Sequence, residues 1–109
     1  ASLSSEEAEW IRSHIAGQNP HVRGFHHLKT RKAGPTRFVE FHLLVDAAAS
    51  VEESHQISHE VSAGIKDQFP GSIVTIHIEA CNGYCSPKCA EGCLLPEKDR
   101  WATQRSKRE

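Results

Sequence analysis

The stretch that decides the fold is RFVEFHLLV, residues 37–45. Its side chains alternate in character, and a period of two residues is typical of a β-strand with one buried face. One face is wholly apolar and carries Val39, Phe41, Leu43 and Val45. The opposite face is mixed and carries Phe38, Glu40, His42 and Leu44. The alternation therefore predicts a strand that buries the first set and leaves His42 on the face turned away from the core.

Two further strands are predicted around this one. Downstream, SIVTIHIE (residues 72–79) alternates in the same way, with an apolar face of Val74, Ile76 and Ile78. Its other face carries Ile73, Thr75, His77 and Glu79. Upstream, we expect a short strand from about residue 22 to about residue 30. The segment KAGPT (residues 32–36) reads as the hairpin turn between them, because Gly and Pro supply turn backbone angles.

Two helices complete the pattern. Ser4 or Ser5 can cap a first helix that runs to about residue 16. Ser50 and Glu53 have the spacing of a capping box, and FPG (residues 69–71) ends the helix that follows. The buried stripe predicted for this second helix is Ile57, Val61 and Ile65. The order α-β-β-α-β predicts an α+β sandwich in which the helices cover one face of a mainly antiparallel sheet.

Composition excludes several function classes. The chain has 109 residues and a net charge of −1, which suits one small domain and favours neither nucleic acid nor an anionic membrane as partner. It has no run of about 18 apolar residues that could insert into a bilayer. Since no signal-peptide segment is seen, we expect a cytoplasmic location, where thiols stay reduced. No C-x-x-C pair or Ser/His/Asp arrangement points to an enzyme.

Eight histidines and four cysteines in so short a chain make metal binding the first hypothesis. His42, His77 and Glu79 would converge on one surface if their two strands are neighbours. Imidazole and carboxylate ligands suit Zn(II) among the borderline metals. The competing interpretation is that each strand histidine is only a tolerated polar residue.

The remaining histidines are harder to place. His55 and His59 are four residues apart on the second helix, so they share a face that points away from the core. This face could meet a second protomer, or it could simply be solvated. Residue parity cannot place His26 and His27, because adjacent strand residues point to opposite faces. The other two, His14 and His21, are assigned to solvated surface.

All four cysteines lie in CNGYCSPKCAEGC (residues 81–93), each four residues after the last. They are Cys81, Cys85, Cys89 and Cys93. Ser86 and Pro87 resemble the start of a short helix. Four thiolates suit Zn(II) or Cu(I), whereas the alternative is a pair of disulfides. A cytoplasmic location favours metal ligation. We therefore divide the chain into a metal-binding domain, residues 1–80, and a Cys-rich segment with a polar tail, residues 81–109.

Three stretches together closely resemble one protein family. They are GFHHLKTRKAGPTRFVEFHLLVD (24–46), SVEESHQISHEV (50–61) and FPGSIVTIHIE (69–79). The likeness is to the cytosolic C-terminal domain of cation diffusion facilitator metal transporters, and it covers roughly residues 4–80. It implies a ferredoxin-like, metallochaperone-like fold. It also implies a V-shaped homodimer that binds metal near the subunit interface and is drawn together by it.

The resemblance also implies ligands. The zinc-binding positions of the family match His26, His42, His55 and His77, and Glu79 stands where the family usually has Asp. His27 and His59 stand where family members often have acidic residues. Both changes add imidazole nitrogen, which favours borderline metals over Mn, so Zn(II) is the first choice. The Cys-rich segment is not part of the usual family pattern.

Two functions remain open. The first is the regulatory dimerisation domain of a zinc exporter, whose transmembrane transporter half is absent from this sequence. The alternative is a free-standing Cu(I)/Zn(II) carrier or buffer that uses its cysteines to supply a metal-accepting protein.

Overall fold

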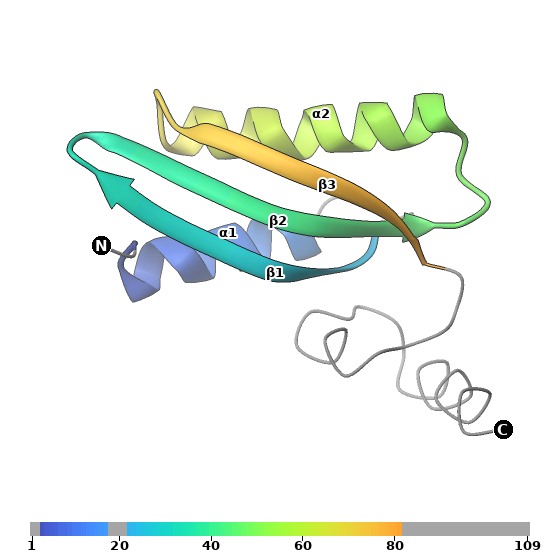
Figure 1. The fold of residues 1–109 in the computed structure, drawn as a ribbon, viewed down its shortest axis with the longest axis horizontal. Helices are drawn as coiled ribbons and strands as arrows, with labels where there is room; N and C mark the ends of the chain where they lie inside the picture. The colour runs from blue at the N-terminus through green and yellow to red at the C-terminus, as the bar shows by residue number, and fades with distance from the viewer. Residues whose placement is uncertain (1–2, 18–21, 82–109) are drawn as a thin grey trace, which may run out of the picture.

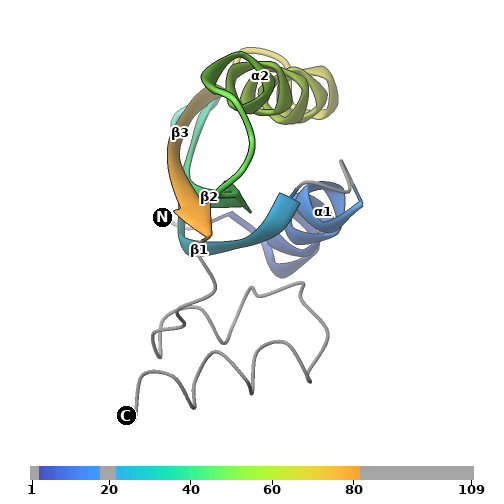
Figure 2. The ribbon, with the colours of Figure 1, turned by 90° about the vertical axis from the view of Figure 1, so that its right-hand side faces the viewer.

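The computed structural model describes residues 3–17 and 22–81. It contains two helices and three strands in the predicted order (Figure 1). They are helix α1 (Ser5–Ala16), strand β1 (Val22–Ala33), strand β2 (Thr36–Asp46), helix α2 (Val51–Gln68) and strand β3 (Ile73–Cys81). Both helices lie on the same side of the sheet, which leaves the other side uncovered by them (Figure 2). The predicted α+β class and element order are confirmed.

The sheet has the order β1-β2-β3 and is mixed. β1 and β2 pair antiparallel around a tight turn, in which Gly34 adopts a positive φ of 59°. β2 and β3 pair parallel, because α2 crosses over the sheet and returns the chain to the same end. The expectation of a mainly antiparallel sheet is therefore wrong for one of the two strand pairs. Instead, β2, α2 and β3 form a parallel βαβ unit.

Both helices begin at the predicted caps. The Ser4 hydroxyl accepts a hydrogen bond from the backbone N–H of Glu7 at 3.2 Å. The Ser50 hydroxyl accepts one from the N–H of Glu53 at 3.0 Å. In each case the glutamate side chain also reaches back to the cap, so the capping box predicted for the second helix is confirmed, and the first helix has one too.

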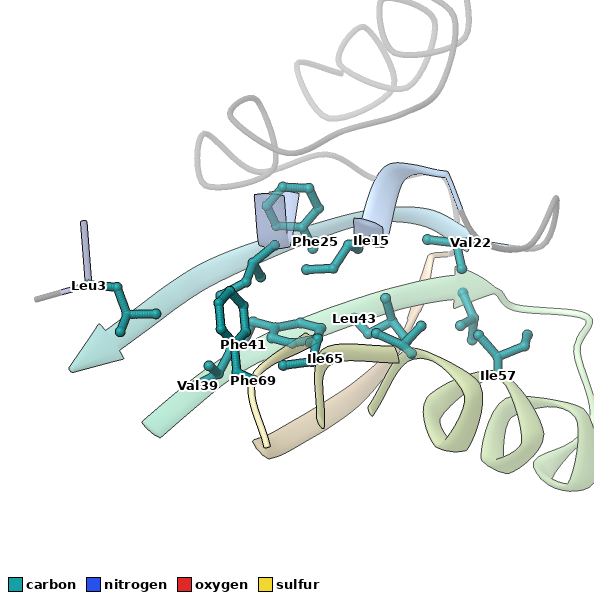
Figure 3. Close-up of a cluster of buried hydrophobic side chains, with 13 residues drawn as sticks. Leu3, Ile15, Val22, Phe25, Val39, Phe41, Leu43, Ile57, Ile65 and Phe69 are labelled. Carbon is teal, nitrogen blue, oxygen red and sulfur yellow. The ribbon is translucent and has the colours of Figure 1, made fainter. Parts of the chain in front are cut away.

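The core lies between the sheet and the two helices (Figure 3). The inward face of β2 is buried throughout, as its alternation predicts: Val39, Phe41, Leu43 and Val45. The stripe predicted on α2 is buried as well: Ile57, Val61 and Ile65. Each such side chain contributes about 1.5–3 kcal/mol when it leaves water. Because all of this burial is on one side of the sheet, the other side is free to carry polar groups.

The two helices meet at a small residue. His14 of α1 places its Nε2 3.2 Å from the carbonyl oxygen of Val61, and its ring stacks on Trp10 at 4.9 Å. A Cβ built at Gly64 of α2 would lie 2.2 Å from Cε1 of His14, so only glycine permits this approach. The assignment of His14 to solvated surface is wrong, since the ring is half buried between the helices. His21 lies outside the described residues.

A polar contact fixes α1 to the sheet. Nε of Arg37 donates a hydrogen bond to Oε2 of Glu7 at 2.6 Å, and this bond lowers the pKa of the Glu7 carboxyl. The same guanidinium lies 5.0 Å above the ring of Phe69.

Neither helix of the described ranges is both long enough and apolar enough to cross a bilayer.

Candidate metal site

Strand register aligns three histidines across the open face. His26 of β1 pairs with His42 of β2, and His42 pairs with His77 of β3. Glu79 stands opposite Leu44, one step further along the same face. The convergence predicted for His42, His77 and Glu79 therefore has its structural basis in the parallel pairing of β2 and β3.

The tightest group in this row consists of His26, His42 and Glu79. One ligand atom from each lies within 4.8 Å of the others. Nε2 of His26 is 3.4 Å from Oε1 of Glu79, and Nδ1 of His42 directly contacts the same oxygen. The Glu79 carboxylate thus faces one nitrogen from each of two imidazoles. A cation placed among these three atoms could be coordinated by all of them.

His26 is the most enclosed of the three. Its side chain is 10% exposed, and neither ring nitrogen has a hydrogen-bond partner among the described residues. A buried polar group without a partner costs about 1–3 kcal/mol. Burial also lowers the pKa of His26 below its ordinary 6.5, with nearby Glu79 opposing this shift. The ring is therefore neutral near pH 7, and it keeps a lone pair for a metal.

Glu79 supplies the negative charge of the group. Its pKa is lowered from 4.5, chiefly because His42 donates a hydrogen bond to the carboxylate. A neutral imidazole pair with one carboxylate is a ligand set found on protein-bound zinc, and three protein ligands leave a fourth position open. Chemically, these residues can hold a divalent borderline cation.

His27 joins the open face through an irregularity in β1. Its φ is +57°, and the register with β2 shifts between His26 and Lys29. The ring of His27 lies 4.6 Å from that of His26 and 5.0 Å from that of His42. This bulge is why parity could not place the two residues: both rings reach the same cluster. His27 itself is exposed and lies outside the three-residue group.

His77 stands beside the group rather than in it. Its ring stacks on that of His42, with centroids 4.7 Å apart and planes at 26°. Nε2 of His77 lies 3.0 Å from Oε2 of Glu40, two residues before His42 on β2. Glu40 was placed on the correct face by the alternation of residues 37–45 but was not predicted as a site residue. Parity was the signal that could have found it.

The helix histidines are separate from the sheet cluster. His55 and His59 are exposed on α2, as predicted. α2 lies on the covered side of the sheet (Figure 2). The cluster is on the open side, because His42 alternates with the inward-facing residues of β2. Within one chain, the structure does not bring these two residues to the cluster.

Of the four cysteines, the structure describes one. Cys81 is the last residue of β3, pairs in register with Asp46, and is a half-buried free thiol. Its place on β3, two residues after Glu79, puts it on the open face. Cys85, Cys89 and Cys93 lie outside the described residues, as do the short helix predicted at Ser86 and the polar tail.

Comparison with known proteins agrees with this geometry. Residues 3–81 match the family described as the cytoplasmic domain of cation efflux proteins. The chain is 45% identical over 76 residues to the cation-efflux pump FieF of Pectobacterium atrosepticum, covering 70% of this chain and 25% of that protein. It is 37% identical over 81 residues to FieF of Escherichia coli O127:H6, covering 74% and 27%. The chain thus spans about a quarter of the length of these curated relatives, which bear the names of pumps rather than enzymes.

Solved structures extend the likeness to three dimensions. A chain of CzrB, a protein described as a zinc transporter, superposes with a TM-score of 0.67 at 40% identity, covering 72% of this chain and 96% of that one. A zinc form of CzrB gives 0.64 at 39% identity, covering 78% and 96%. The metal-bound C-terminal domain of CzcD from Thermotoga maritima, at 22% identity and 0.62, covers 73% and 96% and shares the fold. The chain belongs to the family of cation efflux cytoplasmic domains.

Proposed function

We propose that this chain is a metal-responsive domain that binds Zn(II) on the open sheet face through His26, His42 and Glu79. The observation that carries the proposal is the buried His26 ring, which faces Glu79 and has no hydrogen-bond partner for either nitrogen among the described residues. A fold that only needed stability would gain by replacing this ring with an apolar one. A role as a metal ligand would explain why a polar ring is buried at position 26.

Zinc fits the ligands better than harder cations. The group offers two imidazole nitrogens and one carboxylate oxygen, whereas Mg, Ca and Mn favour oxygen ligands. Burial keeps the His26 ring neutral, so binding there requires little proton displacement near pH 7. The zinc form of CzrB, at 39% identity, supports the same choice.

We further propose that the domain works as a homodimer. One chain brings three ligands together, and a fourth can come from His77 or from a second protomer. The exposed pair His55 and His59 on α2 is available to such a partner. In this arrangement, Zn(II) that bridges two copies draws them together, as the family resemblance implies.

The proposed setting is a membrane exporter. The chain spans about a quarter of the length of its pump relatives. Within it, we assign residues 1–80 to the regulatory metal-binding domain. A transmembrane half would carry out the transport. Metal bound to this domain would couple the activity of that half to the cytosolic metal concentration. The remaining residues, 81–109, form the second unit of the proposed division.

The first experiment is a chelator-competition titration with Zn(II). It uses protein in which all four cysteines are serine, so that thiolates cannot mask the sheet site. We expect His42→Ala to lower the Zn(II) affinity by about 100-fold or more. Loss of a residue that only hydrogen-bonds to a metal ligand already lowers metal affinity by about 10–100-fold. Glu60→Ala is the matched control, because Glu60 is an exposed α2 carboxylate bonded to Gln56. A His42→Ala protein that binds Zn(II) as tightly as its parent would sink the proposal.

Dimerisation is measured on the same samples by sedimentation. Adding Zn(II) should shift the parent toward dimer or compact an existing dimer, and His55→Ala should weaken that response. If His55→Ala responds as the parent does, the helix histidines are solvated surface and His77 is left as the fourth ligand.

A second candidate function concerns the cysteines. Cys81 is a free thiol on the same face and strand as Glu79, so the first residue of the Cys-rich segment adjoins the proposed zinc site. A Cu(I) or Zn(II) carrier built on this segment predicts tight Cu(I) binding by reduced protein. Cu(I) affinity that survives conversion of all four cysteines to serine would exclude it.

A further inference from the structure

A groove lies on the open face between the metal cluster and the hairpin turn. Two rows of side chains cross the sheet there, because the three strands are in register. One row is Arg31, Phe38 and Ile73, and the other is Lys29, Glu40 and Thr75. These side chains line most of a groove of about 290 Å³, close to the lower end of the roughly 300–1,000 Å³ usual for small-molecule sites.

The β1 side of the groove is positively charged. Lys29 and Arg31 are exposed, and within residues 3–17 and 22–81 neither side chain has an ion pair or a hydrogen bond. The carboxylate of Glu40 stands opposite Lys29, but its Oε2 lies 3.0 Å from Nε2 of His77. Two cations against one carboxylate leave the groove with an excess of one positive charge. The groove therefore favours an anion.

Phe38 holds Arg31 in a useful position. The guanidinium carbon of Arg31 lies 4.0 Å from the centroid of the Phe38 ring. A guanidinium over a ring face keeps its N–H groups free, and their planar fork matches two oxygens of one anion. Lys29 lies two residues away on the same face and can meet a third oxygen. A phosphate group has three terminal oxygens, whereas a carboxylate has two.

The β3 side of the groove is uncharged. Ile73 is 50% exposed there, and Thr75 adds a hydroxyl group. A ligand that fills the groove therefore needs an anionic end over β1 and an uncharged, partly apolar body that reaches β3.

We propose that this groove binds a small soluble phosphate ester. Its phosphate group lies against Lys29 and Arg31, and its body covers Ile73. The proposal is independent of the zinc site, because none of the groove residues belongs to the group of ligand atoms within 4.8 Å of one another. Either proposal can therefore fail while the other stands.

A simpler role for the two cations must be separable from this one. β1 is an edge strand, and charged side chains on edge strands discourage pairing with other chains. Cations with that role alone would attract any anion through charge. They would not distinguish a phosphate ester with an apolar body from inorganic phosphate.

The test uses the full metal-free chain, kept reduced, at about 0.15 M salt. Phenyl phosphate and inorganic phosphate are titrated separately, and backbone amide NMR shifts report affinity, location and folding. We expect phenyl phosphate to bind about 5-fold more tightly than inorganic phosphate, because its ring covers apolar surface. The shifts should cluster around residues 29–31, 38–40 and 73–75.

Four variants locate the contacts. Arg31→Gln should weaken phenyl phosphate about 10-fold, since it removes charge-assisted hydrogen bonds, and Arg31→Lys should lie between it and the parent. Ile73→Ala should reduce the preference for phenyl phosphate to about 2-fold or less and leave inorganic phosphate unchanged. The control for net charge is Lys66→Gln in the last turn of α2, which should change either affinity by less than about 2-fold.

Three results would overturn the inference. The first is a folded Arg31→Gln protein that binds phenyl phosphate as tightly as the parent. The second is an equal loss in Arg31→Gln and Lys66→Gln, or equal affinity for the two phosphates, which would mean attraction by charge alone. The third is sedimentation of the protein with vesicles of phosphatidic acid and phosphatidylcholine when phenyl phosphate causes no shift. That result would make the cations a membrane-facing surface instead of a small-molecule site.

Discussion

The two faces of β2 are built from alternate residues of one strand, yet they follow opposite rules. The inward face carries four apolar side chains, none more than 3% exposed, packed against two helices. The outward face carries His42 and Glu40, each in contact with an ionisable partner on β3. The first face stabilises the fold, whereas the second is partly exposed, with the His42 and Glu40 side chains 31% and 46% exposed, and it carries the proposed zinc ligand His42. Substitutions on the two faces should therefore separate stability from metal affinity.

The largest expected effect comes from the inward face. Phe41 is fully buried, and Phe41→Ala should cost about 3–5 kcal/mol of unfolding free energy because it leaves a cavity in the core. Urea denaturation of the metal-free protein measures this loss. If the variant is as stable as its parent, the helix-covered face of β2 is not what stabilises the fold, and the contrast between the two faces fails.

His26→Leu tests the open face in the opposite direction. It removes two buried nitrogens that have no hydrogen-bond partner among the described residues, and leucine has a similar volume. The metal-free protein should become more stable by about 1 kcal/mol, while Zn(II) affinity falls by about 100-fold. Denaturation and chelator competition on one sample give both values. Lower stability together with unchanged affinity would show that His26 is an ordinary structural residue.

Gly64→Ala probes the helix contact, away from both faces. The new Cβ would displace the His14 ring, which would lose its contact with the Val61 carbonyl and its stack on Trp10. These losses exceed the roughly 1 kcal/mol that alanine gains over glycine in a helix, so we expect a net loss of about 1 kcal/mol.

The sign of that effect should reverse when His14 is removed. In a His14→Ala background, Gly64→Ala should stabilise by about 1 kcal/mol, because only helix propensity remains. Zn(II) affinity should stay unchanged throughout. Thermal unfolding of the four proteins in this cycle checks the sign, and a stabilising Gly64→Ala in the parent would refute the close contact.

The smallest effect is on the pH dependence of stability. The pKa values of His26 and Glu79 are lower in the fold than their ordinary 6.5 and 4.5. Each group therefore contributes stability above its ordinary pKa and loses it as pH falls through the folded pKa. Metal-free stability should begin to fall below about pH 6.5, and further below about pH 4.5. His26→Leu should abolish the first decline; if the decline persists, another group causes it.

Local patterns predicted most of the fold. Alternation along residues 37–45 identified the core face of β2, and Ser50 with Glu53 identified the start of α2. The parallel pairing of β2 and β3 was missed because strand direction depends on how the intervening helix packs. His14 was misplaced because its burial depends on Gly64, which is 50 residues away in the sequence.

The candidate site was predicted less completely. His42, His77 and Glu79 could be grouped by parity, since each lies on a regular part of its strand. His26 and His27 could not, because the bulge that turns His27 to φ +57° breaks the alternation. Glu40 was overlooked because an isolated glutamate on an exposed strand face carries no pattern beyond parity.

The parallel crossover has a consequence for folding kinetics. His42 and Glu79 are 37 residues apart in sequence and meet only after α2 has returned the chain beside β2. Closing such a non-local pair is slow, and the ligands are not assembled in the unfolded chain. Zn(II) that binds only the finished sheet stabilises it by mass action. It should therefore prolong the lifetime of the folded domain by retarding unfolding, and leave the rate of folding almost unchanged.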